Sequence, residues 1–565
     1  TRANGRVYER MMTCCGPLWE RDENGVTTSY SYNTARQLVE TIRSAVADGE
    51  TMITPETITS YTRDALGKIT SLRRDAGPMT TVESREYDLL GRLIRETDIL
   101  GRTTVRSYSG DGLVETVTTP AGATLITRKS PSGAVVRRYG TGQQDILYTV
   151  EATAEGIRTT EAVPGGEGGA PRVVTGSSTV NGFGDLVRIA AANTLNGENV
   201  RTLAYDDKGR LIREQLADMA PTLYAYDAFG NRTRAIVALE DEPTFLNSRI
   251  TDYAYVAESR EDGIYRLVSI TSYTSSGTPV LQKRAALLSA LSSVLAGKTV
   301  MTDPRGHDTV EWTEYGGGSV RLQKKTVPGV GSVALTRVVD GFTTAVTGFD
   351  GATRRQRTYT ETGITYADTD VRGNVFTAVC DIAGRIISGT DAAGNTTTYA
   401  YAQPFDLPTC VTNALGKTAC SVYDIRGRKE AEWGTAIQPA VYAYDAAGHI
   451  VSLSTFRDPG DVITTDPRLR TDGDITTWTY DVATGLVVRK TYANATHVDT
   501  AYDALNRVSA TTDARGTVAS RSYAPLTGEL TSITFNDDGF TPSISSRYNH
   551  LGQLTQIEDA SGTRT

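Results

Sequence analysis

A short pattern that recurs at a fixed spacing constrains this sequence more than any other feature. The pattern is Tyr-Asp-x-x-Gly, and a basic residue often follows it. A step of 21 residues separates one tyrosine from the next in four places: Tyr87 to Tyr108, Tyr205 to Tyr226, Tyr423 to Tyr444, and Tyr502 to Tyr523. A fixed period of this kind marks a repeat architecture. The copies that define it are Tyr87-Asp88 with Gly91, Tyr205-Asp206 with Gly209, Tyr226-Asp227 with Gly230, Tyr423-Asp424 with Gly427, Tyr444-Asp445 with Gly448, and Tyr502-Asp503.

Each copy has the chemistry of a β-turn. Asp at the first position of a type I turn bonds its own backbone, and Gly at the fourth position takes the left-handed conformation of a G1 bulge. Turns of a second type keep Asp and Gly but lack the tyrosine, such as Asp391 with Gly394; in Asp381 with Gly384, Cys380 stands in its place. Most neighbouring turns are 10 or 11 residues apart, which leaves six or seven residues for each strand. The repeat therefore predicts a β-meander.

The number of strands limits the shape of the sheet. One strand every 10 or 11 residues over 565 residues gives about 50 strands, too many for one open twisted sheet, so the sheet must curl or close. Only 39% of residues are apolar, with 28 Tyr and 10 Phe, so we expect a single-layer wall with two largely polar faces. Residues 281–295, which contain Ala-Ala-Leu-Leu-Ser-Ala-Leu, have the strongest helical propensity and predict one short helix on the wall.

Aromatic residues often stand two apart within a predicted strand, as in Tyr224/Tyr226 and Tyr442/Tyr444. Residues two apart lie on one face of a strand, so equivalent copies are expected to stack as aromatic ladders. A sugar-stacking platform has the same spacing and is the functional alternative. Regular repetition favours packing within the wall.

These residues resemble the YD-repeat family, also called Rhs repeats, which includes bacterial polymorphic toxins, the C component of insecticidal Tc toxins and the teneurin shell. The match covers nearly the whole chain, loosely at residues 115–200 and 235–370. The resemblance implies an all-β fold in which antiparallel hairpins spiral into a hollow β-shell that, in the toxins, encloses a C-terminal polypeptide. It also implies a secreted or cell-surface bacterial protein. The self-cleavage motif Asp-Pro-x-Gly-Leu of toxin members is not matched at Asp303-Pro304 or Asp458-Pro459.

Charge and cysteine usage exclude several other classes. A net charge of −8 without a basic run gives no electrostatic footprint for nucleic acid. The longest apolar stretch, 285–296, is too short to span a bilayer. Cys410 and Cys420 flank one turn and could be bridged across a hairpin, but the preferred interpretation makes them small apolar fillers of the wall. No Cys-x-x-Cys pair supports a zinc site.

No catalytic, cofactor or metal site is predicted. His449 and His550 occupy variable turn positions, and His307 and His497 also favour solvated positions over a general base. Neither Gly-x-Ser-x-Gly nor His-Glu-x-x-His occurs. Most Asp residues are explained by turns.

Residues 1–565 are therefore interpreted as one repeat shell, an internal piece of a longer chain, whose end strands need covering or will associate end to end. The main hypothesis is a structural shell that encloses or displays another polypeptide of the same precursor, whose partners are that polypeptide or neighbouring repeats. The first alternative is a cell-surface adhesion or scaffold protein that binds through loops such as 164–171 or 457–474. The second is a carbohydrate-active enzyme with a carboxylate pair.

Overall fold

The structure is a computed structural model in which almost every element is a β-strand. It describes residues 8–22, 25–165, 171–240, 242–260, 263–290, 296–302, 307–316, 319–327, 331–340, 342–348, 351–457, 466–537 and 539–564. These residues contain 49 strands and one short 3₁₀ helix, η1 (Pro467–Leu469). The predicted all-β fold and the strand number are confirmed.

The first part of the chain, to residue 302, forms β1 (Glu9–Met12), β2 (Pro17–Arg21), β3 (Thr27–Tyr32), β4 (Leu38–Arg43), β5 (Val46–Asp48), β6 (Thr51–Thr54), β7 (Thr57–Arg63), β8 (Ile69–Ala76), β9 (Met79–Tyr87), β10 (Leu93–Thr97), β11 (Thr103–Tyr108), β12 (Val114–Thr118), β13 (Thr124–Lys129), β14 (Val135–Tyr139), β15 (Ile146–Thr153), β16 (Gly156–Val163), β17 (Val173–Val180), β18 (Leu186–Ala192), β19 (Glu198–Tyr205), β20 (Leu211–Leu216), β21 (Thr222–Tyr226), β22 (Arg232–Ala238), β23 (Ser248–Arg260), β24 (Gly263–Tyr273), β25 (Pro279–Ala290) and β26 (Ala296–Thr302).

The remaining strands are β27 (Asp308–Gly316), β28 (Ser319–Val327), β29 (Gly331–Val339), β30 (Phe342–Gly348), β31 (Gly351–Thr360), β32 (Gly363–Thr369), β33 (Val375–Asp381), β34 (Ile386–Thr390), β35 (Thr396–Tyr401), β36 (Pro408–Thr412), β37 (Thr418–Tyr423), β38 (Lys429–Trp433), β39 (Ala440–Tyr444), β40 (Ile450–Thr455), β41 (Asp474–Tyr480), β42 (Val487–Thr491), β43 (His497–Tyr502), β44 (Val508–Thr512), β45 (Val518–Tyr523), β46 (Leu530–Phe535), β47 (Ile544–Tyr548), β48 (Leu554–Asp559) and β49 (Gly562–Arg564).

The described strands form a nearly unbroken meander. Forty-seven of them belong to one sheet, in which neighbours along the chain pair antiparallel. The exception is the hairpin of β5 and β6, which forms its own two-stranded sheet while β4 pairs directly with β7. This hairpin lies between Ala45 and Glu56, where the sequence lacks a Tyr-Asp turn. A register shift falls just before the repeat tyrosine in many hairpins, for example between Val422 and Tyr423, as a G1 bulge requires.

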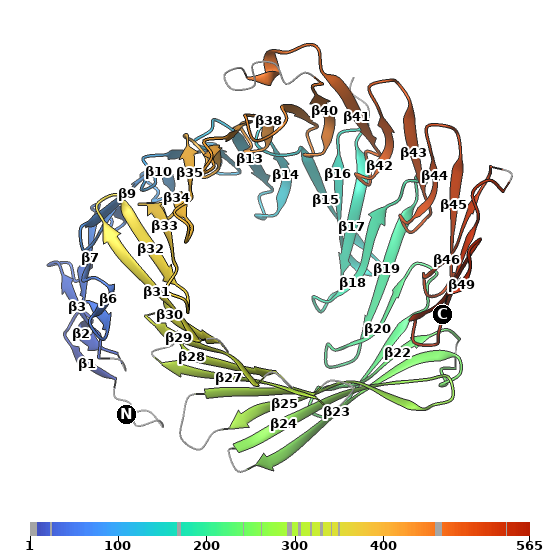
Figure 1. The fold of residues 1–565 in the computed structure, drawn as a ribbon, viewed down its shortest axis with the longest axis horizontal. Coiled ribbons are helices and arrows are strands. Elements are labelled where there is room, and N and C mark those ends of the chain that lie inside the picture. The colour runs from blue at the N-terminus through green and yellow to red at the C-terminus, as the bar shows by residue number, and fades with distance from the viewer. Residues whose placement is uncertain are drawn as a thin grey trace.

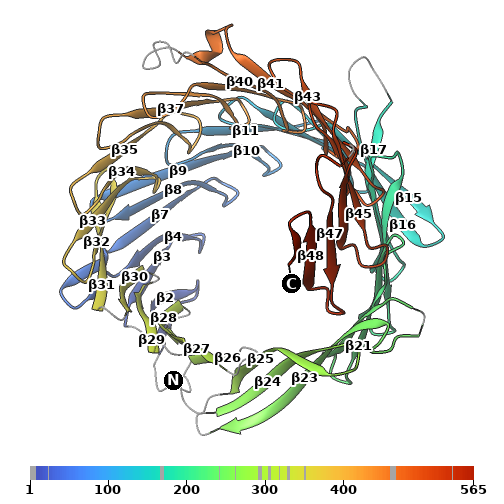
Figure 2. The same ribbon diagram turned by 45° about the vertical axis from the view of Figure 1, so that its right-hand side comes forward.

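The sheet winds around a common centre as a spiral. In both views the strands run round the molecule, and no described strand crosses the middle (Figures 1 and 2). The late strands lie over the early ones, with β33 and β34 beside β9 and β10. We call β1 to β26 the first winding and β27 to β49 the second winding. The chain thus forms a hollow β-shell built from one curved layer.

The hairpin turns lie on two rims because successive strands alternate in direction. The Tyr-Asp turns, such as 88–91, 206–209, 227–230, 424–427 and 503–506, all fall on one rim, here called the YD rim. Turns such as 98–101, 193–196, 391–394, 413–416 and 513–516 fall on the other, here called the opposite rim. The period of 21 residues covers two strands and two turns, which is why the tyrosines return to the same rim.

The wall has no single hydrophobic core. Strand β9 alternates half-buried and exposed residues, and every residue of β37 is half-buried. The largest fully buried side chains are those of Ile53, Thr179, Pro467 and Ser248, and two of these are polar. A single layer with solvent on both sides produces this pattern, because neither face is covered by a second layer.

The predicted helix at 281–295 is wrong. Residues up to Ala290 belong to β25, which pairs with β24 on one side and β26 on the other; residues 291–295 lie outside the described part of the chain. Helix propensity is a weak preference, and two ladders of backbone hydrogen bonds override it. Among the described residues, no helix has the length and apolar character needed to cross a membrane.

Candidate functional site: the clasp and the seam

The repeat residues fold each Tyr-Asp turn around one carboxylate. In the turn after β37, Oδ1 of Asp424 accepts hydrogen bonds from the backbone N–H groups of Arg426 at 2.8 Å and Arg428 at 2.9 Å. Oδ2 of Asp424 accepts from Nε of Arg428 at 2.7 Å. Gly427 has a φ of 80°, the left-handed value that the turn requires. The aspartate therefore fixes both the turn and the arginine that follows it.

The tyrosine of the next repeat closes over that arginine. The guanidinium of Arg428 lies 4.5 Å from the ring centre of Tyr444, within cation–π range. The hydroxyl of Tyr444 donates to the carbonyl of Lys429 at 2.7 Å, and Nη1 of Arg428 donates to the carbonyl of Asp445 at 3.1 Å. We call this Asp–Arg–Tyr unit the clasp. It joins consecutive repeats because its tyrosine precedes the next turn.

The clasp recurs along both windings. Its arginine-over-tyrosine pairs, with the distance from guanidinium to ring centre, are Arg92–Tyr108 (4.3 Å), Arg210–Tyr226 (4.9 Å), Arg385–Tyr401 (4.6 Å) and Arg507–Tyr523 (4.2 Å). In these repeats the tyrosine hydroxyl donates to a carbonyl 15 residues earlier. The same hydroxyl bond is made by Tyr423 and Tyr502, while Tyr87 and Tyr205 donate to Ile69 and Leu186.

The remaining predicted repeat residues occupy the same turn positions. Oδ1 of Asp88, Asp206, Asp227, Asp381, Asp391 and Asp503 accepts from backbone N–H groups within the turn. The glycines at 91, 209, 230, 384, 394 and 448 have φ values from 73° to 105°. Sequence patterning alone could not find the stacking on arginine. Among the described residues, no two tyrosine rings stack on each other, so the predicted aromatic ladder is wrong. In the clasps an arginine guanidinium lies over the tyrosine ring instead.

The clasp lowers the pKa of its carboxyl groups. Side-chain and backbone hydrogen bonds from Arg210 hold the pKa of Asp206 below its ordinary value. Burial alone would raise the pKa of Asp424, but the N–H and guanidinium of Arg428 outweigh it and the pKa is lowered. Both turns therefore hold ionised carboxylates at neutral pH.

In two of the Tyr-x-Tyr pairs the first tyrosine bonds to a glutamate of the preceding strand. Tyr224 donates to Glu214 at 2.6 Å, and Tyr442 donates to Glu432 at 2.7 Å. Burial, followed by the glutamate bond, raises the pKa of each tyrosine to about 12. These hydroxyls are thus engaged within the wall.

A second set of contacts joins the two windings along a line that we call the seam. Here the YD rim of the second winding meets the opposite rim of the first, and the bonded residues are 280 to 314 positions apart. Arg426 donates from Nε to the carbonyl of Thr141 at 2.7 Å, and Arg102 donates from Nη1 to Oδ1 of Asp406 at 2.7 Å. The acceptors are largely backbone carbonyls and carboxylates.

Asparagine and histidine turns continue the seam. Nδ2 of Asn506 donates to the carbonyl of Ala192 at 3.0 Å, and Nδ2 of Asn193 donates to the carbonyl of Ala504 at 3.2 Å. Asn506 replaces the turn glycine and has a φ of 62°, which asparagine tolerates better than most residues. His550 lies 2.8 Å from the carbonyl of Ser248 through Nε2.

The β5–β6 hairpin fills the seam where the windings first meet. Thr54 and Arg43 both donate to the carboxylate of Asp340, and Nε of Arg357 donates to the carbonyl of Ile53. Ile53 is 1% exposed. Sequence reasoning missed the seam entirely; its one signal is a departure from the repeat pattern, such as the insertion after β4 or Asn506 in place of glycine.

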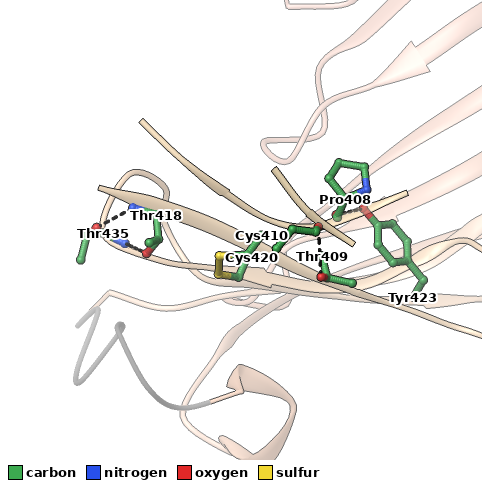
Figure 3. The surroundings of a disulfide bond; sticks show 8 residues. Pro408, Thr409, Cys410, Thr418, Cys420, Tyr423 and Thr435 are labelled. Carbon is green, nitrogen blue, oxygen red and sulfur yellow. Dashed lines mark hydrogen bonds between the residues drawn. A yellow bond between two sulfur atoms is a disulfide. The ribbon is translucent and has the colours of Figure 1, made fainter. Parts of the chain in front are cut away.

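Cys410 and Cys420 form a disulfide, so the interpretation of this pair as separate apolar fillers is corrected. The two residues are direct cross-strand partners in β36 and β37, with Cα atoms 3.9 Å apart. Figure 3 shows the bridge beside the bond from Tyr423 to the carbonyl of Pro408. Antiparallel register places the two side chains on the same face, where the flanked turn brings them together.

His449 also differs from the expected solvated position. It occupies the arginine position of its repeat: Nδ1 lies 2.9 Å from Oδ2 of Asp445, and its ring stacks on Tyr480 with centroids 4.5 Å apart. His449 therefore takes the place of the arginine in a clasp, and its contacts with Asp445 and Tyr480 account for its position.

The structure describes only part of the loops that the adhesion hypothesis requires. Residues 166–170 of the loop 164–171 and 458–465 of the loop 457–474 lie outside the described residues, as do Asp303 and Pro304. In the described chain, no cluster of three or more His, Cys, Asp or Glu side chains is placed to hold a metal ion. A pocket of about 260 Å³ lies on the seam, lined by Arg249, Leu551 and six other residues. That volume is below the range of drug-sized sites.

This chain is similar to known proteins in the sequence of one segment and in its fold. A family model described as RHS Repeat matches residues 87–124, a segment that contains the clasp of Asp88, Arg92 and Tyr108. Residues 87–124 of this chain are therefore an RHS repeat by sequence. No curated protein matches in sequence.

Solved structures share the shell. The crystal structure of TcdB2-TccC3 superposes with a TM-score of 0.53 over 98% of this chain and 36% of that one, at 12% identity. TcdB2-TccC3-Cdc42 gives a TM-score of 0.53 over 98% of this chain and 38% of that one, at 10% identity. A form of TcdB2-TccC3 without its hypervariable C-terminal region gives 0.51, with 96% and 36% coverage, at 11% identity. The chain thus spans little more than a third of the length of these proteins. At 10–12% sequence identity, the similarity shows a shared fold.

Proposed function

We propose that this chain is the wall of a non-enzymatic shell that encloses or displays another polypeptide of the same precursor. The main support for this proposal is the seam, because its side-chain hydrogen bonds hold one winding against the other and so close the wall. In an open sheet the two windings would not meet, and Arg426, Asn506 and Asp340 would lack these partners. The clasp supports the same conclusion, because the recurring Asp, Arg and Tyr side chains of the repeat bond to one another and to backbone groups of neighbouring strands.

The structural neighbours support a C-terminal polypeptide as the enclosed partner. TcdB2-TccC3 is described with a hypervariable C-terminal region and, in another crystal structure, with Cdc42. In our proposal the wall of this protein has a comparable C-terminal polypeptide as its partner. The protein works outside the producing bacterium, secreted or at the cell surface, and the Cys410–Cys420 disulfide accords with an oxidising compartment.

Protease protection tests the proposal on the precursor. Proteinase K should leave the C-terminal polypeptide intact in the wild type while cutting the same polypeptide when it is free. The double variant R426A/N506G removes donors across the seam; glycine at 506 keeps the left-handed turn. It should expose the enclosed polypeptide while the strand content, measured by circular dichroism, is retained.

Arg515 supplies the matched control, because it lies on the opposite rim of the second winding and is 82% exposed. R515A should leave protection unchanged. Equal cleavage of the C-terminal polypeptide in the free form and within the wild-type precursor would refute enclosure.

A further inference from the structure

The two windings share little backbone pairing along the seam. Strands β26 and β27 pair where one winding passes into the other, and in the described chain no other ladder joins strands of different windings. Between loops, the N–H of Ala220 donates to the carbonyl of Leu526 across the seam at 2.9 Å. The other seam contacts described above come from side chains. The windings can therefore part along the seam without breaking the hydrogen-bond ladders of the wall.

The β5–β6 hairpin belongs to the first winding but adds nothing to its sheet. Strands β4 and β7 pair directly as far as Arg43 and Thr57, so their ladder is continuous without it. Strands β5 and β6 pair with each other in a sheet of their own. Elsewhere in the wall a short turn closes the same gap, as residues 391–395 do between β34 and β35. Residues 44–56 are thus longer than the wall requires.

The extra length reaches the second winding. Asp48 pairs with Arg337, and the carbonyl of Ile53 accepts a hydrogen bond from Nε of Arg357. The guanidinium of Arg357 in turn lies 4.6 Å from the ring centre of Phe342. Ile53 is 1% exposed, and Phe342 is also buried. In a wall that lacks a core, the hairpin therefore forms a small buried contact between the windings.

Asp340 of the second winding is bound by the hairpin and by the strand before it. Nη1 of Arg43 donates to Oδ2 of Asp340 at 3.1 Å, and the hydroxyl of Thr54 donates to the same carboxylate. Burial alone would raise the pKa of Asp340, but the hydrogen bonds from Thr54 and Arg43 outweigh it and the pKa is lowered. Asp340 has a φ of 51°, which few residues other than glycine adopt readily. The hairpin thus holds an ionised carboxylate at a special backbone position.

We propose that the β5–β6 hairpin is a latch, and that the wall opens at this part of the seam when the hairpin leaves its place between the windings. Opening breaks the contacts of Asp340, Arg337 and Arg357 and leaves the ladder of β4 and β7 intact. Here the windings then stay connected through their own sheet and not through the seam. This role concerns how the windings are held, and it stands whether or not a polypeptide is enclosed.

A transplanted turn tests the latch. Replacing residues 44–56 with Asp-Ala-Ala-Gly-Asn, the sequence of 391–395, should join β4 to β7 as β34 is joined to β35. Fluorophores attached through non-natural amino acids at Val82 in β9 and Gln356 in β31, both exposed, report the separation of the windings in the full-length protein. Energy transfer between them should fall in the latch-free variant, while circular dichroism shows the same strand content. Unchanged transfer would overturn the proposal.

Asp340→Asn separates a lost latch from a lost fold. Asparagine tolerates a left-handed φ but lacks the charge that Arg43 binds, so transfer should fall while strand content is retained. Asp75→Asn is the matched control, because Asp75 is likewise bonded to an arginine and a threonine, both within the first winding. It should leave transfer unchanged. No fall in Asp340→Asn, or an equal fall in both variants, would show that the hairpin does not hold the windings together.

Discussion

The guanidinium of Arg428 is held between Asp424 in its own turn and the ring of Tyr444 in the next repeat. Nε donates to the carboxylate at 2.7 Å, and the ring centre lies at 4.5 Å. Only a quarter of the arginine side chain is exposed. One side chain thus couples a turn to the following hairpin, and the repetition of this coupling gives the wall its continuity.

Replacing Arg428 with alanine should lower the free energy of unfolding by about 1–2 kcal/mol, since both the charged hydrogen bond and the stacking are lost. Lysine should restore only part of this, because it lacks the planar fork that serves both partners. Chemical denaturation measures the loss. Arg515→Ala at an 82% exposed site should change stability by less than about 0.5 kcal/mol; an equal loss in both variants would contradict the role of the clasp.

Replacing Gly230 with valine should cost about 1 kcal/mol or more, because a β-branched residue resists the φ of 85° found there. A Cβ at Gly230 would have no heavy atom within 4 Å, so crowding does not contribute. Ala228→Val in the same turn should cost much less. Thermal melting compares the two variants, and matching losses would show that backbone conformation is not the cause.

The contribution of Asp206 to stability should disappear in acid. Its pKa is lowered in the folded protein by hydrogen bonds from Arg210. The contribution is therefore complete above the ordinary carboxyl pKa of about 4 and is lost as pH falls through the lower folded-state value. Asp206→Asn keeps an acceptor for the turn but loses the charge. The difference in melting temperature between this variant and the wild type should be constant from about pH 7 to 5 and shrink below about pH 4; a difference that grows in acid would contradict this sign.

Reduction of the Cys410–Cys420 disulfide should destabilise the protein by roughly 2–3 kcal/mol, the entropic value for a short closed loop. C410S/C420S should melt at the temperature of the reduced wild type and be insensitive to reductant. Cys14 and Cys15 are free thiols, so C14S/C15S should keep the full effect of reductant. Intact mass under non-reducing conditions checks the bridge directly, and two thiols at 410 and 420 would contradict it.

The sequence predicted what is decided within one hairpin. Asp424 and Gly427 select a turn through their own backbone bonds, so the meander could be read from their spacing. The helix at 281–295 failed because propensity is local, whereas β24 and β26 supply hydrogen bonds from outside the segment. The stacking of Arg428 on Tyr444 could not be predicted for a similar reason. The spacing of residues shows which face of a strand they share, but it does not show which side chain of the neighbouring repeat will lie against that face.

The seam could not be predicted because it depends on curvature. Whether Arg426 meets Thr141 is decided by how far each strand twists relative to the last, summed over one winding. A small change in that angle would bring other residues together. No short pattern in the sequence encodes this sum.

The separation of seam partners by 280 to 314 residues has a consequence for the order of folding. Clasps and hairpins join near neighbours and can form as soon as their residues leave the ribosome, because local contacts form quickly. Arg102 must wait for Asp406, and Asn193 must wait for Ala504. During synthesis the first winding is therefore expected to exist as an open ribbon whose opposite rim guides the second into place, so that the nascent chain serves as its own template.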